Sequence, residues 1–283
     1  MVRRRTVALV LAVLVVLAGC TASVSAAWHA PAASAGTTSI LTRVDGARSA
    51  TPLAPAKPAA LASPSPSPIP LPPLLGPGGL RGPDGSMYRT GSSAVALTFD
   101  DGPGRYTGQI LDVLKRYGIH ATFCIIGSQV AAQASLIRRM VREGHTLCNH
   151  TWSHDEKLRT RTPAQIASEL RRTDDAIHAI VPGAQISYFR NPGGNFSPQT
   201  VAIAASMGMR SLYWSVDPDD WTVPGTQTII NNVISHTRSG SIVLMHDGGG
   251  DRAETVAALK TLLPTLKNRY KLVALPTSAT SSG

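Results

Sequence analysis

The 283-residue sequence predicts an α/β fold in which about seven parallel strands alternate with helices. Three observations support this. Short apolar runs recur between residues 94 and 274, stretches of helical periodicity separate them, and clusters of polar side chains follow where the apolar runs end. Strands joined by helices pair in parallel, so the sheet is expected either to be buried on both faces or to be rolled into a barrel.

The predicted elements follow one another in regular alternation. The strands are expected at 94–99, 121–126, 145–149, 187–190, 212–216, 241–245 and 270–274. The helices are expected between them, at 107–117, 130–143, 163–180, 198–207, 227–237 and 253–267.

Several of these boundaries carry a local signal. Two helix starts combine a capping residue with proline at the first helical position, and two helix ends meet a glycine: Thr162-Pro163, Ser197-Pro198, Gly118 and Gly208. Pro264 lies inside the last predicted helix, where it is expected to cause a kink or an early end.

Residues 1–27 have the features of a secretory signal peptide. Arginines at positions 3 to 5 precede an apolar run from Val7 to Ala18, which is shorter than the ~20 residues that span a bilayer. The run leads into Leu17-Ala18-Gly19-Cys20, which resembles the lipobox of bacterial lipoproteins, in which the cysteine is lipidated. We therefore expect an exported protein, held at the outer face of the cytoplasmic membrane through Cys20, or secreted if cleavage follows Ala26.

Composition divides the rest of the chain. Residues 28–86 are rich in Pro, Ala and Ser and cannot bury enough apolar surface to offset their ordering entropy, which predicts a disordered tether. Residues 87–277 are expected to fold as a single domain, and residues 278–283 to form a flexible tail. The net charge is +10, but no basic stripe with interleaved aromatic residues is present, so no nucleic-acid partner is expected. We expect a monomer.

The segment TFDDGP, residues 98–103, places Asp100 and Asp101 side by side. Neighbouring side chains on a strand point to opposite faces, so the pair can serve one site only if the strand has ended. Gly102 and Pro103 are expected to supply the turn. Taken alone, the motif is more typical of a solvated Asp-Gly turn.

Four further polar clusters follow predicted strands. They are His150 with His154, Arg190, the segment 217–221, and His246-Asp247. The carboxyl ends of parallel strands lie at one edge of a sheet, where the reactive groups of such folds gather. The sequence therefore predicts a single functional site that includes TFDDGP.

His150 and His154 are four residues apart, which on one helical turn would aim both imidazoles at the same point. With one aspartate of TFDDGP they form a set that suits Zn²⁺ with an open position for water. The other aspartate would then be free to deprotonate that water. No glutamate follows His150, so the zinc-peptidase helix signature is disfavoured.

His246 is the candidate general acid, and either Asp217 or Asp220 could hold its imidazole in one tautomer. Trp221 either packs in the core or forms a wall of the substrate groove. Adjacent aspartates can also bind Mg²⁺ for phosphoryl transfer, but no phosphate-binding loop accompanies them.

Five segments occur in the order TFDDGP, HTWSH, RNPGG, DPDDW and LMHD. They resemble the five motifs of the polysaccharide deacetylase family, also called the NodB-homology domain or carbohydrate esterase family 4. The resemblance covers nearly the whole predicted domain. It implies a distorted parallel (β/α) barrel and a metal-dependent hydrolase, with Zn²⁺ as the expected metal, that removes acetyl groups from a polysaccharide, usually from N-acetylglucosamine-type units.

The resemblance also implies a role for each matching residue. It makes Asp100 the general base, Asp101, His150 and His154 the metal ligands, Arg190 the residue that orients the base, and His246 the acid, tuned by Asp220. It places Pro192 and Gly193 at the substrate, with the backbone N–H near Gly193 binding the oxyanion, and Trp221 and Leu244 around the acetyl methyl group.

Two positions depart from the family pattern. Gly193-Gly194 stands where many relatives have an aromatic residue after the proline, which opens the groove. Cys148 stands where glycine is usual, and Cys124 lies in the preceding strand. Because consecutive strands of such a barrel are neighbours, the resemblance predicts a Cys124–Cys148 disulfide close behind His150, in keeping with an oxidising compartment.

The expected substrate is an acetylated polysaccharide, with peptidoglycan favoured over chitin or xylan because an anchored enzyme on a long tether could reach its own wall. One alternative is an acetylxylan esterase of the same family. Another is a non-catalytic module that binds wall glycan, but binding a sugar requires neither the base Asp100 nor the acid His246.

Overall fold

The protein is described by a computed structural model that covers residues 82–277. The predicted signal peptide, Cys20, almost all of the tether and the tail lie outside the described residues. Within them, parallel strands form a seven-stranded sheet in the order β5-β4-β3-β2-β1-β6, with β7 also paired to β1. The strands are β1 Val95–Gly102, β2 Thr122–Ile125, β3 Thr146–Asn149, β4 Ile186–Phe189, β5 Arg210–Ser211, β6 Ile242–His246 and β7 Leu272–Val273.

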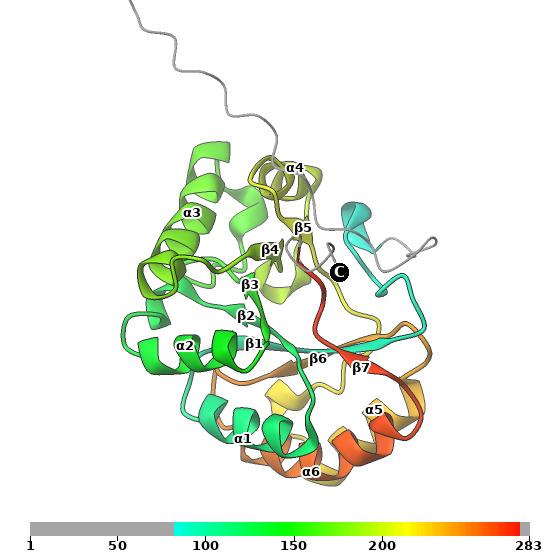
Figure 1. The fold of residues 1–283 in the computed structure, drawn as a ribbon. Helices are drawn as coiled ribbons and strands as arrows, with labels where there is room; N and C mark the ends of the chain where they lie inside the picture. Colours follow the sequence, from blue (N-terminus) through cyan, green and yellow to red (C-terminus); the bar gives the residue numbers. More distant parts are fainter. Residues whose placement is uncertain (1–81, 278–283) are drawn as a thin grey trace, which may run out of the picture. The chain divides into compact units, whose positions relative to one another are not determined.

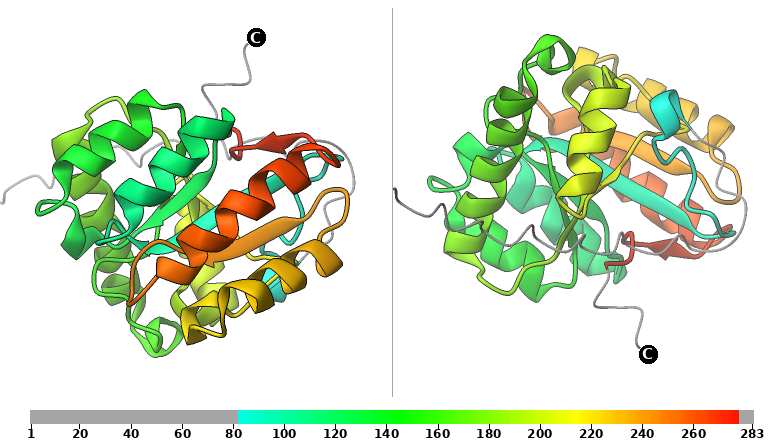
Figure 2. Two further views of the ribbon diagram at one scale, coloured as in Figure 1. Left: turned by 90° about the horizontal axis from the view of Figure 1, so that it is seen from below. Right: turned by 90° about the horizontal axis from the view of Figure 1, so that it is seen from above.

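Six α-helices of the described region lie around the outside of the curled sheet (Figures 1 and 2). They are α1 Thr107–Tyr117, α2 Ala134–Arg142, α3 Pro163–Ile180, α4 Pro198–Ser206, α5 Thr226–His236 and α6 Ala253–Lys267. Short 3-10 helices connect them, of which η5, Asp220–Thr222, contributes to the site. No helix between residues 82 and 277 has both the length and the apolar character to cross a membrane.

The alternation of side chains along β1 explains why apolar clusters pack on both faces of the sheet. Val95, Leu97 and Phe99 pack in the large apolar cluster that includes residues of α1, α2, α5 and α6. Ala96 points to the other face, into a smaller cluster that contains both cysteines of the predicted disulfide. The sheet is therefore buried on both faces and curled, which confirms the predicted distorted (β/α) barrel.

The capping signals work as expected. Thr162 and Ser197 each accept a hydrogen bond from the backbone N–H three residues later, in capping boxes that start α3 and α4. Gly118 ends α1 with φ 61. Of the two outcomes expected at Pro264, the early end is wrong, because α6 continues to Lys267. The carbonyl of Lys260, four residues earlier, instead accepts a hydrogen bond from the Tyr117 hydroxyl at 3.1 Å.

The predicted strand 212–216 is also wrong, since β5 comprises only Arg210–Ser211. The following residues cross from one side of the curl to the other: Leu212 bridges to Met87, and Val216 bridges to Val243 of β6. A segment that pairs with different partners at its two ends cannot continue one ladder. Smaller differences affect α2, which begins at Ala134, and β7, which is shorter than predicted.

Candidate active site

The two aspartates of TFDDGP lie at an irregularity in β1. The strand extends to Gly102 rather than ending before Asp100, and its register with β2 shifts between Phe99 and Gly102. Asp101 has φ 71, a left-handed conformation that costs energy for a residue with a side chain. This change of backbone direction lets two successive side chains serve one site, so the turn predicted from Gly102-Pro103 begins one residue earlier.

Asp101, His150 and His154 form a candidate metal site. One ligand atom from each lies within 4.8 Å of the others. Asp101 Oδ1 is 3.3 Å from His150 Nε2 and 3.1 Å from His154 Nε2, yet this buried oxygen accepts no hydrogen bond from the described residues. Burial opposes ionisation, but the two imidazoles hold the pKa of Asp101 well below its usual range. An ionised, unsatisfied oxygen that faces two imidazole nitrogens fits a divalent cation.

The two histidines do not lie on a helical turn, so that part of the prediction is wrong. β3 ends at Asn149, and residues 150–154 form a loop in which Thr151 and His154 have φ values of 68 and 56. His154 N donates to Thr151 Oγ1 at 3.0 Å, which closes the loop. Both imidazoles still reach Asp101 because the loop doubles back.

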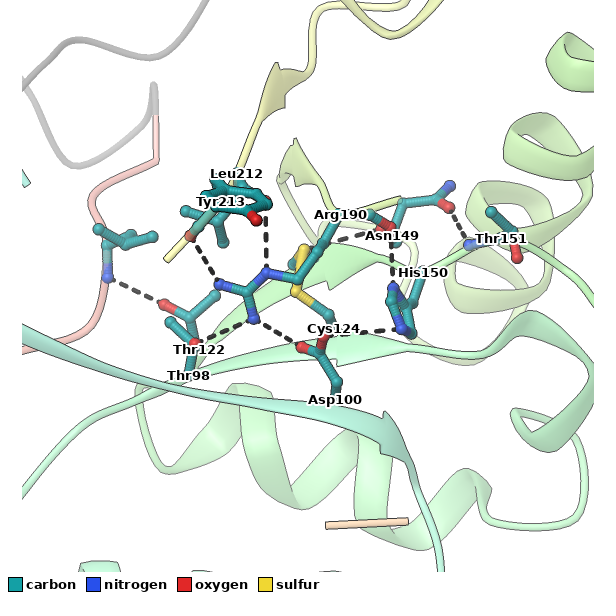
Figure 3. Close-up of a disulfide and its surroundings, with 12 residues drawn as sticks. Thr98, Asp100, Thr122, Cys124, Asn149, His150, Thr151, Arg190, Leu212 and Tyr213 are labelled. Carbon is teal, nitrogen blue, oxygen red and sulfur yellow. Dashed lines mark hydrogen bonds and ion pairs between the residues drawn. A yellow bond between two sulfur atoms is a disulfide. The ribbon is translucent and has the colours of Figure 1, made fainter. Parts of the chain in front are cut away.

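His150 is oriented by a backbone acceptor. Its Nδ1 donates to the carbonyl of Arg190 at 2.8 Å, as Figure 3 shows. Nε2 is therefore the nitrogen left to face Asp101. Two residues that were not predicted hold the loop. Asn149 Oδ1 accepts from Thr151 N at 2.8 Å, and Glu169 Oε2 in α3 accepts from the backbone of residues 152 and 153 at 3.1 and 2.9 Å.

Arg190 and Asp100 form a buried ion pair, shown in Figure 3. Arg190 is fully buried at the end of β4, and its Nη1 donates to Asp100 Oδ1 at 2.7 Å and to Thr98 Oγ1 at 2.9 Å. Its other nitrogens donate to backbone carbonyls of residues 212 and 213. Asp100 Oδ2 is not used by this pair and lies 3.6 Å from His150 Nε2, next to the candidate metal site.

His246 at the end of β6 pairs with Asp220. Its Nδ1 donates to Asp220 Oδ1 at 2.7 Å, and its backbone N–H donates to Oδ2 at 3.0 Å. Burial alone would lower the pKa of His246, but Asp220, with smaller contributions from Asp100 and Asp101, raises it to about 9. Asp217 instead accepts a hydrogen bond from Asp219 N. Of the two aspartates considered as partners of His246, Asp220 is therefore the one that pairs with it.

Cys124 and Cys148 are neighbours across β2 and β3, and the structure joins them in a disulfide. Both are fully buried on the inner face of the curl. Figure 3 shows the disulfide beside Arg190 and close to His150. The disulfide therefore links the strand that leads into the histidine loop to its neighbour.

The candidate metal ligands, Asp100 and His246 line one cavity of about 620 Å³. Its walls include both aspartates of TFDDGP, all three histidines, and four residues predicted or noted for the substrate side: Gly193, Gly194, Trp221 and Leu244. Trp221 is 55% exposed, so it lies at the rim rather than in the core. Pro192 is buried and is not part of the wall.

Trp214 is a further wall residue that was not predicted. Its ring stacks on Tyr213 with centroids 4.1 Å apart. A Cβ atom at Gly194, where φ is 66, would come within 2.6 Å of Trp214 Cη2. The glycine therefore leaves room for this indole, and the groove that Gly193-Gly194 was expected to open is partly filled from the other side.

Comparisons with known proteins find a matching family and named relatives. Residues 88–212 match the sequence model of the polysaccharide deacetylase family. A chitooligosaccharide deacetylase of Bradyrhizobium sp. is 40% identical over 200 residues, which cover 66% of this chain and 91% of the relative. A peptidoglycan-N-acetylglucosamine deacetylase of Bacillus cereus is 38% identical over 192 residues, which cover 64% of this chain and 85% of the relative.

Solved structures show the same fold. A peptidoglycan N-acetylglucosamine deacetylase has a TM-score of 0.62 at 32% identity and covers 65% of this chain and 87% of its own. A family 4 carbohydrate esterase from Streptomyces lividans has a TM-score of 0.60 at 32% identity, covering 67% and 95%. A pseudoenzyme of the same family from Bacillus anthracis reaches 0.61 at 29% identity, covering 66% of each chain. Fold similarity alone thus does not distinguish active from inactive members.

Proposed function

Because the chain belongs to the polysaccharide deacetylase family and is a polysaccharide N-deacetylase, we propose that it is a Zn²⁺-dependent enzyme acting on the N-acetylglucosamine units of peptidoglycan. The observation that carries the proposal is that one cavity presents a paired base, a paired acid and a three-residue ligand set. A glycan-binding module would need none of these three.

Asp101, His150 and His154 would hold the metal. When bound, the ion would supply Lewis-acid chemistry, polarising the acetamide carbonyl and making water more acidic. The set of two imidazoles and one carboxylate suits Zn²⁺, and all three residues line the cavity.

Asp100 would act as the base. Arg190 Nη1 donates to its Oδ1 at 2.7 Å, so the buried carboxylate has a cationic partner on the side away from the candidate metal site. Its Oδ2 would accept a proton from the attacking water, so that the oxygen adds to the acetamide carbonyl carbon.

His246 would act as the acid. With a pKa of about 9 it is protonated at neutral pH, and Asp220 holds its Nδ1–H, so Nε2–H is the proton available to the substrate. Transfer of this proton to the departing nitrogen breaks the carbon–nitrogen bond. The products are acetate and a free amine on the sugar.

The remaining roles concern the acetyl group. The backbone N–H near Gly193, at the cavity wall, would donate to the oxyanion that forms on the carbonyl oxygen. Trp221 and Leu244 would pack around the methyl group. Pro192, buried beneath the wall, would act by shaping this segment rather than by touching the substrate.

Peptidoglycan is proposed because of the predicted anchor and tether, while the chitooligosaccharide deacetylases among the relatives make chitin-type oligomers the second candidate. The test is acetate release from peptidoglycan, N-acetylated chitooligosaccharides and acetylxylan, each with Zn²⁺ supplied. Faster release from peptidoglycan supports the proposal. Faster release from acetylxylan would favour the esterase alternative, and no release from any substrate would refute the function.

We also propose that the protein is exported and lipidated at Cys20. The test compares incorporation of labelled fatty acid into the wild-type protein and into Cys20→Ala in an expressing bacterium. Label in the wild type alone supports the anchor. Secreted, unlabelled wild-type protein beginning at Ala27 would instead indicate cleavage after Ala26.

A further inference from the structure

Asp220 is held by contacts from outside its own turn. It lies in η5, next to Asp219 with φ 54, and no side chain caps this 3-10 helix. It accepts hydrogen bonds from His246 in β6, from Arg252 just before α6 and from Thr255 in α6, which lie 26 to 35 positions later in the chain. The placement of the partner of His246 therefore depends on tertiary contacts.

Thr255, in the first turn of α6, makes one of these contacts. It is fully buried, and its hydroxyl donates to Asp220 Oδ2 at 2.7 Å. Threonine inside a helix commonly donates to a carbonyl of the preceding turn, but this hydroxyl bonds across to the carboxylate. Because Oδ2 is occupied by Thr255 and by the backbone N–H of His246, rotation of the carboxylate is restrained and Oδ1 stays on His246 Nδ1.

Arg252 fixes the backbone around the same carboxylate. It is 3% exposed, and its guanidinium donates to the carbonyls of Asp220 at 2.9 Å, Gly248 at 2.9 Å and Gly249 at 3.3 Å. Because Arg252 holds the backbone of Asp220, the carboxylate can still move only by rotation about the side-chain torsions of Asp220. Thr255 restrains it.

We propose that Thr255 is a positioning residue for the proton donor, acting through Asp220 on His246. This inference rests on the proposed role of His246 as the acid. Thr255 is not part of the cavity wall, so it does not contact the substrate. The loss of rate on removing the Thr255 hydroxyl should therefore depend on how strongly the leaving group of the substrate needs a proton.

Two substrates separate such an effect from general damage. An N-acetylated chitooligosaccharide releases an amine, which cannot leave without a proton, whereas 4-nitrophenyl acetate releases a phenolate that can. For Thr255→Val, which keeps the shape and removes the hydroxyl, we expect the kcat for N-deacetylation to fall about 10- to 100-fold. Hydrolysis of the aryl ester should stay within about 3-fold of the wild type, and Thr255→Ser should restore N-deacetylation to within about 3-fold.

A double-mutant cycle with Asp220→Ala gives a second measurement. If Thr255 acts through Asp220, adding Thr255→Val to Asp220→Ala should change kcat for the glycan by less than about 2-fold. Equal losses on both substrates, full activity of Thr255→Val, or additive losses in the cycle would each overturn the positioning role.

His246→Ala distinguishes a failure of the positioning role of Thr255 from a failure of the acid role of His246. If it removes N-deacetylation while Thr255→Val has no effect, only the positioning role of Thr255 fails. If it leaves N-deacetylation unchanged, the proposed acid is wrong and the inference falls with it.

Discussion

Asp100 and Asp101 are adjacent in the sequence, but their Oδ1 atoms face different partners. Asp100 Oδ1 accepts from Arg190 at 2.7 Å, whereas Asp101 Oδ1 faces the imidazoles of His150 and His154 at 3.3 and 3.1 Å. The left-handed backbone of Asp101 produces this division. In the proposed mechanism, this division lets Asp100 act as the base while Asp101 would hold the cation.

The first prediction concerns that division. Asp100→Asn removes the proton acceptor but leaves the candidate ligands, so acetate release should fall about 10²- to 10⁴-fold while bound zinc stays the same. His154→Ala is the matched variant, and it should lose zinc. Zinc content by mass spectrometry and acetate release are measured on the same samples. Unchanged activity in Asp100→Asn would refute its assignment as base.

The second prediction concerns pH. His246 must be protonated to act as an acid, and its pKa is raised to about 9, so kcat/KM should be retained at neutral pH and fall as the pH rises through about 9. Asp220→Ala removes the main group that raises this pKa, so the descending limb should move to lower pH. The profile is measured on an N-acetylated oligosaccharide. A limb at the same pH in both proteins would contradict the pairing.

The third prediction concerns the disulfide. Cys124 and Cys148 are 24 residues apart in the sequence, and a cross-link closing a loop of this size stabilises a fold by about 3 kcal/mol. The double variant Cys124→Ala with Cys148→Ala should lose a free energy of unfolding of that order in urea titrations. Non-reducing peptide mapping of the wild type is the control. Two free thiols there would mean that no cross-link contributes.

The fourth prediction concerns His145, which lies away from the cavity. Its Nδ1 accepts from Ala121 N at 3.1 Å, so the ring must be neutral at this nitrogen. Burial, with the nearby His120, lowers its pKa from 6.5 to about 4. The unfolded chain therefore binds a proton more readily, and stability that is complete above about pH 6.5 should be lost progressively toward pH 4.

The matched variant is His145→Asn, whose side-chain oxygen keeps an acceptor near the same place. Between pH 7 and pH 5, the wild type should lose about 2 kcal/mol more of its free energy of unfolding than the variant. Urea unfolding at the two pH values measures the difference. Parallel losses would show that His145 does not titrate between those limits.

The site residues were predictable from the sequence because each lies at or just beyond the carboxyl end of a strand. Parallel strands end at one edge, so Asp100, His150, Arg190 and His246 could be grouped before their distances were known. The shape of the histidine segment was not predictable in the same way. Spacing of four residues suggested a helical turn, but bonds from Asn149 and Glu169 hold the segment as a loop.

Residues that act through others were missed. Thr255 and Arg252 have no local signal, because they reach Asp220 across more than thirty positions of the chain. Trp214 was missed for a similar reason: its place in the cavity wall depends on the absence of a side chain at Gly194, twenty positions earlier.

The sequence by itself determined the alternation of strands and helices, the set of chemical groups and the edge of the sheet at which they meet. These follow from local patterns and from the rule that strands joined by helices run in parallel. The tertiary structure decided which aspartate faces the histidines, which carboxylate partners His246, and how the curl closes through residues 212–216. Those outcomes depend on backbone conformations and long-range hydrogen bonds, whose partners are brought together only when the chain is packed.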